Sequence, residues 1–393
     1  MNYRAPFPWF GSKSRIAAEV WKRLGDVPCY IEPFFGSGAV LLGRPHPFQG
    51  VETINDKDGL VCNFWRAVKN DPEAVAEHAD YPALENDLHA RHVWLVDHKD
   101  SLQAKLEGNP DFYDAKAAGW WVWGMACWIG SGFCSGKGPW KRKQVDGVWQ
   151  LVNCSGADQG VERRRVQLSS TGQGVERKRV HLSNAGQGVS RQCVRLGKAG
   201  RGVKRQRVHL GDAGQGVSRQ CVRLGKAGRG NPGTGECGLL AWMEALAERF
   251  SRVRVCCGDW RRICGGNSGN ALEHFFHSGQ SCGVFLDPPY SAAAERDENI
   301  YRQDSLTVAH DVREWVLEHG DDSRLRIALC GYESEHKMPS SWKCLEWKAS
   351  SGYAQVGKNK NLNGKANRHR ERIWFSPHCL EPAPLSAARY WWD

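Results

Sequence analysis

Four consecutive residues late in the chain, Asp287, Pro288, Pro289 and Tyr290, could together hold a planar ring that carries an exocyclic amine. They directly follow residues 284–286, which are typical of the end of a short buried strand. The two prolines fix φ and have no N–H, so the backbone there can only accept hydrogen bonds. The Asp287 carboxylate and the Pro288 carbonyl could accept the two amine hydrogens while Tyr290 stacks on the ring. The alternative is a tight turn after a strand, because Asp and Pro are ordinary turn residues.

A second group of residues, near the N-terminus, indicates a ligand-binding turn. Residues 29–42 have the pattern of a strand, a glycine turn and a helix, in which glycines permit a tight turn and a close approach of a ligand to the backbone. A dinucleotide-binding fingerprint would need glycine or alanine where this chain has Leu41, so NAD is disfavoured. The residues that define this turn are Glu32, Pro33, Phe34, Gly36 and Gly38.

Two further carboxylates are predicted at strand ends. Asp56 ends the strand predicted over residues 51–55 and follows Gly36 at the interval at which an acidic residue holds ribose hydroxyls. A helix N-cap is the alternative for this position, but Asp58 suits that role better, since a helix is predicted from Leu60. Asp259 follows the strand predicted over residues 253–257.

These groups occur in an order that resembles the D12 class, or DNA adenine methylase type, of N6-adenine-specific DNA methyltransferases. The resemblance is carried by W-x-G-x-K, by E-P-F-x-G-x-G and, after a long insertion, by D-P-P-Y. It covers residues 1–70 and 237–378, and phage and prophage members of the family fit best. The first motif consists of Trp9, Gly11 and Lys13.

The resemblance implies a role for each group. S-adenosylmethionine would be the methyl donor, with Lys13 near its carboxylate, Asp56 on its ribose, and Asp259 and Trp260 on its adenine. Residues 287–290 would receive an adenine that has been flipped out of double-stranded DNA. The expected donor-binding residues are Trp9, Gly11, Lys13, Glu32, Pro33, Phe34, Gly36, Gly38, Asp56, Asp259 and Trp260.

The expected fold is α/β, with an open Rossmann-like sheet, because predicted strands and helices alternate and ligand residues fall at strand ends. Helices are predicted over residues 14–24, 239–250 and 304–318, and a late strand over 325–329. Residues 1–70 and 237–378 would form the catalytic domain, and residues 71–158 a helical target-recognition insertion. Residues 159–235 would be a repeat segment, and residues 379–393 a C-terminal tail.

The repeat segment has a period of 14 residues, marked by Gly-Val pairs that begin at Gly160 and recur to Gly216. The whole chain has a net charge of +11, and the excess positive charge lies in residues 159–230, which hold 17 Lys and Arg against 3 Asp and Glu. Regularly spaced arginines could follow DNA phosphates without reading sequence. The alternative is a solvated and dispensable insertion that arose by duplication.

Composition limits the remaining possibilities. The 15 cysteines are scattered without C-x-x-C pairs or His/Cys clusters, so reduced thiols are expected, without zinc or another metal. No apolar stretch is long enough to span a bilayer and no signal peptide is evident, which indicates a cytoplasmic protein of a bacterial or phage-infected cell. A monomer is expected.

Two alternatives to DNA adenine methylation remain open at this stage. Related D/N-P-P-Y turns serve amino-methyltransferases that act on cytosine N4, RNA or a protein amide. The second alternative is a catalytically inactive, nucleic-acid-binding relative. Neither the DNA recognition sequence nor membership of a restriction–modification system can be predicted from these residues.

Overall fold

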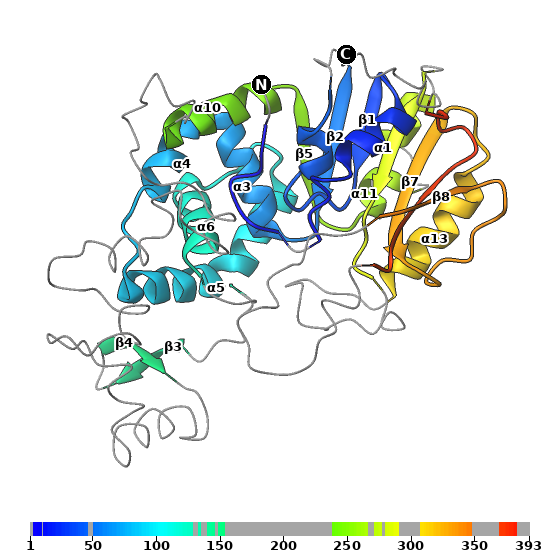
Figure 1. Ribbon diagram of the computed structural model, residues 1–393. Coiled ribbons are helices and arrows are strands. Elements are labelled where there is room, and N and C mark those ends of the chain that lie inside the picture. The colour runs from blue at the N-terminus through cyan, green and yellow to red at the C-terminus, as the bar shows by residue number, and fades with distance from the viewer. Residues whose placement is uncertain are drawn as a thin grey trace, which may run out of the picture. The chain divides into compact units, whose positions relative to one another are not determined.

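The computed structural model describes residues 3–9, 11–45, 50–128, 133–134, 140–145, 148–153, 238–265, 271–276, 280–290, 307–347 and 369–382. The chain forms two compact units (Figure 1). The first contains Met1–Ala5, Trp9–Asp58 and Arg252–Asp393, and the second contains Pro6–Pro8 and Gly59–Ser251. The predicted catalytic and target-recognition domains are assignments of function, so the predicted domain boundaries stay a prediction. The predicted repeats lie outside the described residues.

A seven-stranded mixed sheet forms the centre of the first unit. Its strand order is β5-β2-β1-β6-β7-β9-β8. The first five strands in this order are parallel to one another, while β9 runs antiparallel to both β7 and β8. The strands are β1 (Cys29–Glu32), β2 (Val51–Asp56), β5 (Val253–Cys257), β6 (Cys282–Leu286), β7 (Leu325–Tyr332), β8 (Lys343–Glu346) and β9 (Glu371–Phe375).

The order of the strands reverses at β1. From β1 the chain continues outward to β2 and β5 on one side, whereas β6 pairs with the other side of β1 and leads on to β7. In open α/β sheets, ligands bind outside the carboxyl ends of the strands at such a reversal. The crevice between the ends of β1 and β6 is therefore where this topology predicts a ligand, and Glu32 and Asp287 lie at those two ends.

Alternate side chains of each strand point to opposite faces of the sheet, and helices pack against both faces. On one face Ile31, Val284 and Ile327 share a core cluster with residues of α11–α13. On the other face Tyr30 packs against Trp21 of α1, with ring centroids 4.8 Å apart. The helices of this unit are α1 (Ala17–Leu24), α2 (Ala39–Leu42), α11 (Arg261–Cys264), α12 (Ala271–Phe276) and α13 (Val308–His319).

Several predicted elements are confirmed, with small differences at their ends. The helix predicted from Ser14 begins at Ala17, since residues 14–16 form a turn. The strand predicted over residues 325–329 extends to Tyr332, where it pairs with β9. The helix predicted from Asp304 is described from Val308 as α13, and its expected start lies outside the described residues.

The second unit is built mainly of helices around an aromatic core. Trp65 stacks on Phe250 at 4.6 Å, and Phe7 meets Trp121 edge-on at 4.8 Å. The carboxylates of Asp71 and Asp114 cap two of the helices by accepting hydrogen bonds from their first-turn N–H groups. The elements are α3 (Gly59–Asn70), α4 (Pro72–Ala79), α5 (Glu85–Gly108), α6 (Ala115–Cys127), β3 (Trp140–Val145), β4 (Val148–Asn153) and α10 (Leu239–Phe250).

The described cysteines are free and most are buried. In the described part of the chain, no helix combines the length and the apolar character that a membrane crossing requires.

Candidate active site

A pocket in the first unit is lined by residues from both sequence blocks that were predicted to carry chemistry. It has an empty volume of about 1060 Å³, open solvent at its mouth included. It is lined from the N-terminal block by Trp9, Gly11, Lys13, Glu32, Pro33, Phe34, Gly36 and Asp56, and from the C-terminal block by Asp259, Trp260, Asp287 and Pro289. The fold thus brings together residues that are more than 200 positions apart in the sequence.

The glycine turn needs its glycines for a specific reason. Gly36 has φ +49°, and a Cβ there would come within 2.2 Å of the Trp9 indole nitrogen. Gly38 has φ +66°, and a Cβ there would come within 2.4 Å of the Phe35 ring. Both positions therefore require a residue without a side chain, both for the backbone conformation and for the space. Trp9 of the first motif is in this way packed directly on the turn of the second.

The end of β2 holds this turn in place. The Asp56 carboxylate accepts hydrogen bonds from the backbone N–H groups of Gly36 and Asp58, each at 2.8 Å. Asp58 immediately precedes α3, at the position of a helix N-cap. Asn55 donates from Nδ2 to the carbonyls of Pro33 and Gly258, and so ties the ends of β1 and β5 to β2.

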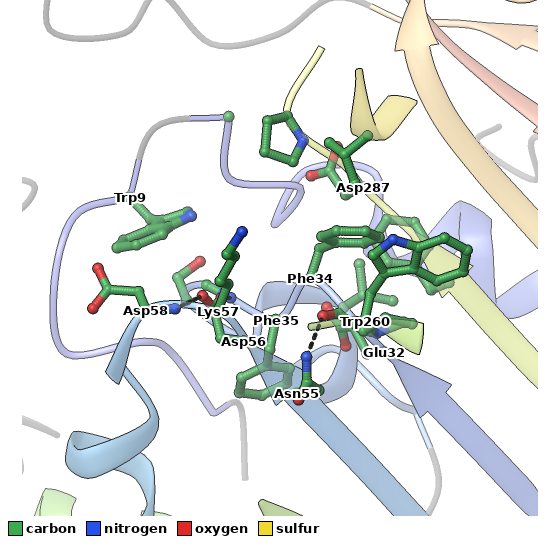
Figure 2. A pocket seen from close by; sticks show the side chains of 18 of the residues that line it. Trp9, Glu32, Phe34, Phe35, Asn55, Asp56, Lys57, Asp58, Trp260 and Asp287 are labelled. Carbon is green, nitrogen blue, oxygen red and sulfur yellow. Dashed lines mark hydrogen bonds between the residues drawn. The ribbon is translucent and has the colours of Figure 1, made fainter. Parts of the chain in front are cut away.

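An aromatic pair forms one end of the pocket. The rings of Phe34 and Trp260 have their centroids 6.3 Å apart, and Figure 2 shows them side by side, with Trp9 at the other end. Asp259 is exposed at the rim, where its carboxylate accepts a hydrogen bond from the Arg261 N–H. Arg261 also forms an ion pair with Asp311 of α13, at 2.7 Å.

Burial has a strong effect on the acid at the end of β1. Glu32 is almost fully buried, and this burial raises the pKa of its carboxyl well above the usual value, although the Tyr30 hydroxyl donates a hydrogen bond to it at 2.8 Å. Burial likewise raises the pKa of Tyr30. Burial thus favours the neutral, protonated form of the Glu32 carboxyl.

The four-residue turn after β6 is anchored by Lys13. The Lys13 ammonium donates to both carboxylate oxygens of Asp287 at 2.8 Å, to the Tyr290 hydroxyl at 3.2 Å and to the Gly11 carbonyl at 3.0 Å. Burial lowers the pKa of Lys13, but Asp287 and Glu371 more than offset this and raise it above the usual lysine value. Lys13 thus contacts the predicted catalytic carboxylate itself.

Tyr290 is held from two sides. Its hydroxyl donates to Glu371 Oε2 at 2.7 Å, and its ring packs edge-on against Tyr332 at 4.5 Å. Tyr290 is 7% exposed, and burial raises the pKa of its hydroxyl well above the usual value. The structure thus places Tyr290 among protein side chains, beside the Asp287 carboxylate, and Pro288 is buried while Pro289 lines the pocket.

The residues around the pocket that the sequence analysis missed include Asn55, Arg261 and Glu371. Glu371 could have been found, because it is an acidic residue at the start of an otherwise apolar strand, E-R-I-W-F, in which a buried charge requires a partner. Asn55 and Arg261 have no comparable sequence signal, since each depends on which strand ends are neighbours.

The polar atoms and charges that line the pocket suit an adenosine-containing methyl donor. Two buried polar atoms of lining residues, Asn55 Oδ1 and Trp260 Nε1, have no hydrogen-bond partner among the described residues. They leave one acceptor and one donor for a ligand beside the aromatic pair. Carboxylates predominate over cations in the lining, which suits the positive charge of a sulfonium. No group of His, Cys, Asp and Glu suited to a metal occurs in the described ranges.

The mostly parallel sheet, with pocket-lining residues at strand ends, is consistent with the Rossmann-like fold of methyltransferases. Residues 9–107 match the family of D12 class N6 adenine-specific DNA methyltransferases, over about a quarter of the 393-residue chain. The matched part contains the first two motifs and Asp56, while Asp259 and residues 287–290 lie outside it. No curated protein matches the chain. The match supports the predicted function, S-adenosylmethionine-dependent methylation of adenine N6 in DNA.

Proposed function

We propose that the pocket binds S-adenosylmethionine on the side of β1, β2 and β5, and that residues 287–290 receive an adenine flipped out of double-stranded DNA. The observation that carries this proposal is that Asp287 lines the same pocket as Gly36, Asp56 and Trp260. The alternative, in which Asp287 only forms a tight turn after the strand, does not require its carboxylate to line that pocket.

Each residue has a role in the proposed reaction. Asp56 holds the ribose hydroxyls, Asp259 binds the donor adenine at the rim, and Phe34 and Trp260 pack on it. The donor supplies an electrophilic methyl group. Lys13 is the anchor of the Asp287 carboxylate, a role that the family resemblance did not imply, since it placed this lysine near the donor's carboxylate.

The target amine is activated by hydrogen bonding. Adenine N6 is a poor nucleophile, because its lone pair delocalises into the ring. Hydrogen bonds from N6–H to Asp287 and to the Pro288 carbonyl localise that pair and stabilise the positive charge that develops on nitrogen. Flipping the base costs a few kcal/mol, and stacking on an aromatic ring returns about 1–3 kcal/mol. Tyr290 is packed against Tyr332 in this structure. Because the proposed stacking needs a free face of the Tyr290 ring, we expect that ring to become accessible when the base enters.

The finer features of the function belong to the same proposal. Methylation is site-specific, with residues 71–158 contributing to target recognition and residues 159–235 contacting phosphates. The enzyme acts as a monomer, without a metal, in the cytoplasm of a bacterial or phage-infected cell. A phage or prophage origin is the one that best fits the family resemblance.

Mass spectrometry of nucleosides tests the proposal. Duplex DNA incubated with the protein and S-adenosylmethionine should yield N6-methyladenine. N4-methylcytosine as the product, or methylation confined to RNA or to a protein amide, would identify a different amino-methyltransferase. Donor binding without any methylated product would instead identify an inactive nucleic-acid-binding relative.

A further inference from the structure

A second carboxylate, Glu371, lies behind the predicted catalytic turn. It is the first residue of β9 and is buried, 81 positions after Tyr290 in the sequence. Its Oε2 accepts a hydrogen bond from the Tyr290 hydroxyl at 2.7 Å and lies 3.9 Å from Lys13 Nζ. Glu371 therefore contacts both residues that hold Asp287 in place, but it does not line the pocket itself.

Burial raises the pKa of the Glu371 carboxyl, while Lys13 and the hydrogen bond from Tyr290 oppose that shift. In the ionised form of Glu371 the charges of this cluster do not cancel. Lys13 donates to both oxygens of Asp287, so these two residues form a neutral pair. Glu371 is then one carboxylate in excess. The neighbouring cation on β9, Arg372, does not neutralise it, because Arg372 pairs with Glu333 at 3.1 Å and with Glu346 at 3.4 Å. Successive side chains of a strand point to opposite faces, which separates Arg372 from the cluster.

The excess charge matches the chemistry of methyl transfer. The N6 lone pair forms the new bond to the methyl carbon, the carbon–sulfur bond breaks, and its electron pair stays on sulfur. N6 becomes positively charged and then loses a proton to water. A cluster with one net negative charge stabilises that positive charge more than a neutral ion pair would, since Lys13 and Glu371 are buried.

We propose that Glu371 is a positioning residue for methyl transfer, which fixes the Tyr290 hydroxyl and Lys13 and leaves the cluster with a net negative charge towards the target amine. This inference rests on the proposed function of the site. Glu371 acts through Tyr290 and Lys13, so its loss should change the rate of transfer and leave the binding of donor and DNA unchanged.

The test is Glu371→Gln, which keeps an acceptor oxygen for the Tyr290 hydroxyl and removes the charge. The single-turnover rate of methyl transfer should fall at least tenfold, on the scale seen when one preorganised electrostatic group is removed. The dissociation constants of S-adenosylmethionine and duplex DNA should stay within about twofold, and the melting temperature should not fall below the assay temperature.

Glu333→Gln is the matched control. Glu333 is an exposed carboxylate that pairs with Arg372, the residue next to Glu371 on β9. This variant should transfer methyl groups at the wild-type rate. If Glu371→Gln does not fold, Glu371→Asp takes its place. That variant keeps the charge but withdraws it by one methylene, so it should bind the donor normally and transfer the methyl group more slowly.

The outcomes separate the two proposals. A wild-type rate in Glu371→Gln, or in Glu371→Asp where only that variant folds, would overturn the role of Glu371 while the function stands. Loss of donor or DNA binding in proportion to the rate would show a structural role and would also overturn it. Absence of N6-methyladenine with the wild-type protein would overturn the proposed function, and the inference with it.

Discussion

The contact between Lys13 and Asp287 joins the first and last motifs of the proposed active site. The two residues are 274 positions apart, yet Lys13 Nζ lies 2.8 Å from both carboxylate oxygens of Asp287. Lys13 fixes the position of the Asp287 carboxylate, whose oxygens can also accept hydrogen bonds from the target amine. The position of the lysine in W-x-G-x-K is explained by the need to reach the end of β6.

Gly36 provides the sharpest prediction for donor binding. In Gly36→Ala, the new Cβ would have to displace Trp9, which lines the pocket, and the backbone would remain at a positive φ. We expect donor affinity to fall at least tenfold, as measured by titration calorimetry. Gly108→Ala is the control, because a Cβ there has no atom within 4 Å. Equal donor affinity in the two variants would contradict the assigned role of the turn.

His92 provides a prediction about pH. The Cys134 N–H donates to His92 Nδ1 at 3.2 Å, and the ring stacks on Trp128, so the imidazole is held neutral. Burial, with a smaller effect of His89, lowers the pKa of His92 to about 4. The unfolded chain takes up the proton at about pH 6.5, so the contribution of His92 to stability is present above that pH and is lost as the pH falls towards 4.

The measurement is denaturant unfolding at pH 7.5 and pH 5.0, followed by tryptophan fluorescence. The unfolding free energy of the wild type should decrease between the two values. In His92→Gln, which cannot titrate, the decrease should be smaller. An equal or larger decrease in the variant would show that His92 does not contribute to the pH dependence.

At the scale of elements, hydrophobic pattern and capping residues predicted most of the helices and strands. The apolar run Val253–Cys257 forms β5, and Leu239–Phe250 forms α10 with the predicted ends. The start of α1 was wrong by three residues, because residues 14–16 form a turn in which the N–H groups of Ile16 and Ala17 donate to the Lys13 carbonyl. The short strand β8 lies within residues 342–347, which the sequence predicts to help complete the sheet, although its side chains are mostly exposed.

Asp114 provides a test of one element. Its carboxylate accepts a hydrogen bond from the Ala117 N–H at 2.8 Å and caps α6. Asp114→Ala should lower the unfolding free energy by about 1 kcal/mol. Glu107→Ala, which removes an exposed carboxylate from the last turn of α5, should change it by less than about 0.5 kcal/mol. A loss no larger than that of the control would mean that the cap contributes nothing to stability.

At the scale of the whole molecule, the sequence predicted an open α/β sheet and the residues at the ends of its strands. It did not predict the order of those strands, because pairing depends on long-range contacts that periodicity does not encode. The pairing of β6 with β1 is what brings Asp287 to the glycine turn. For the same reason Glu371 was missed, since its role depends on β9 pairing with β7.

The basic repeats provide a prediction about DNA affinity. Residues 159–230 hold 17 Lys and Arg against 3 Asp and Glu, so phosphate contacts there would release counterions on binding. A variant lacking residues 159–235 should keep its donor affinity but bind DNA with a weaker dependence on salt concentration. An unchanged slope of log affinity against log salt would show that the repeats do not contact phosphates.

The central claim is that donor and target amine meet at Asp287, and Asp287→Ala tests it most directly. Glu371 remains close to Lys13 in this variant and can still pair with it. Calorimetry should give a donor affinity within about threefold of the wild type. Single-turnover methyl transfer to DNA should be lost, by at least about a thousandfold, the scale of a major electrostatic contribution to catalysis. Methyl transfer at the wild-type rate would contradict the account.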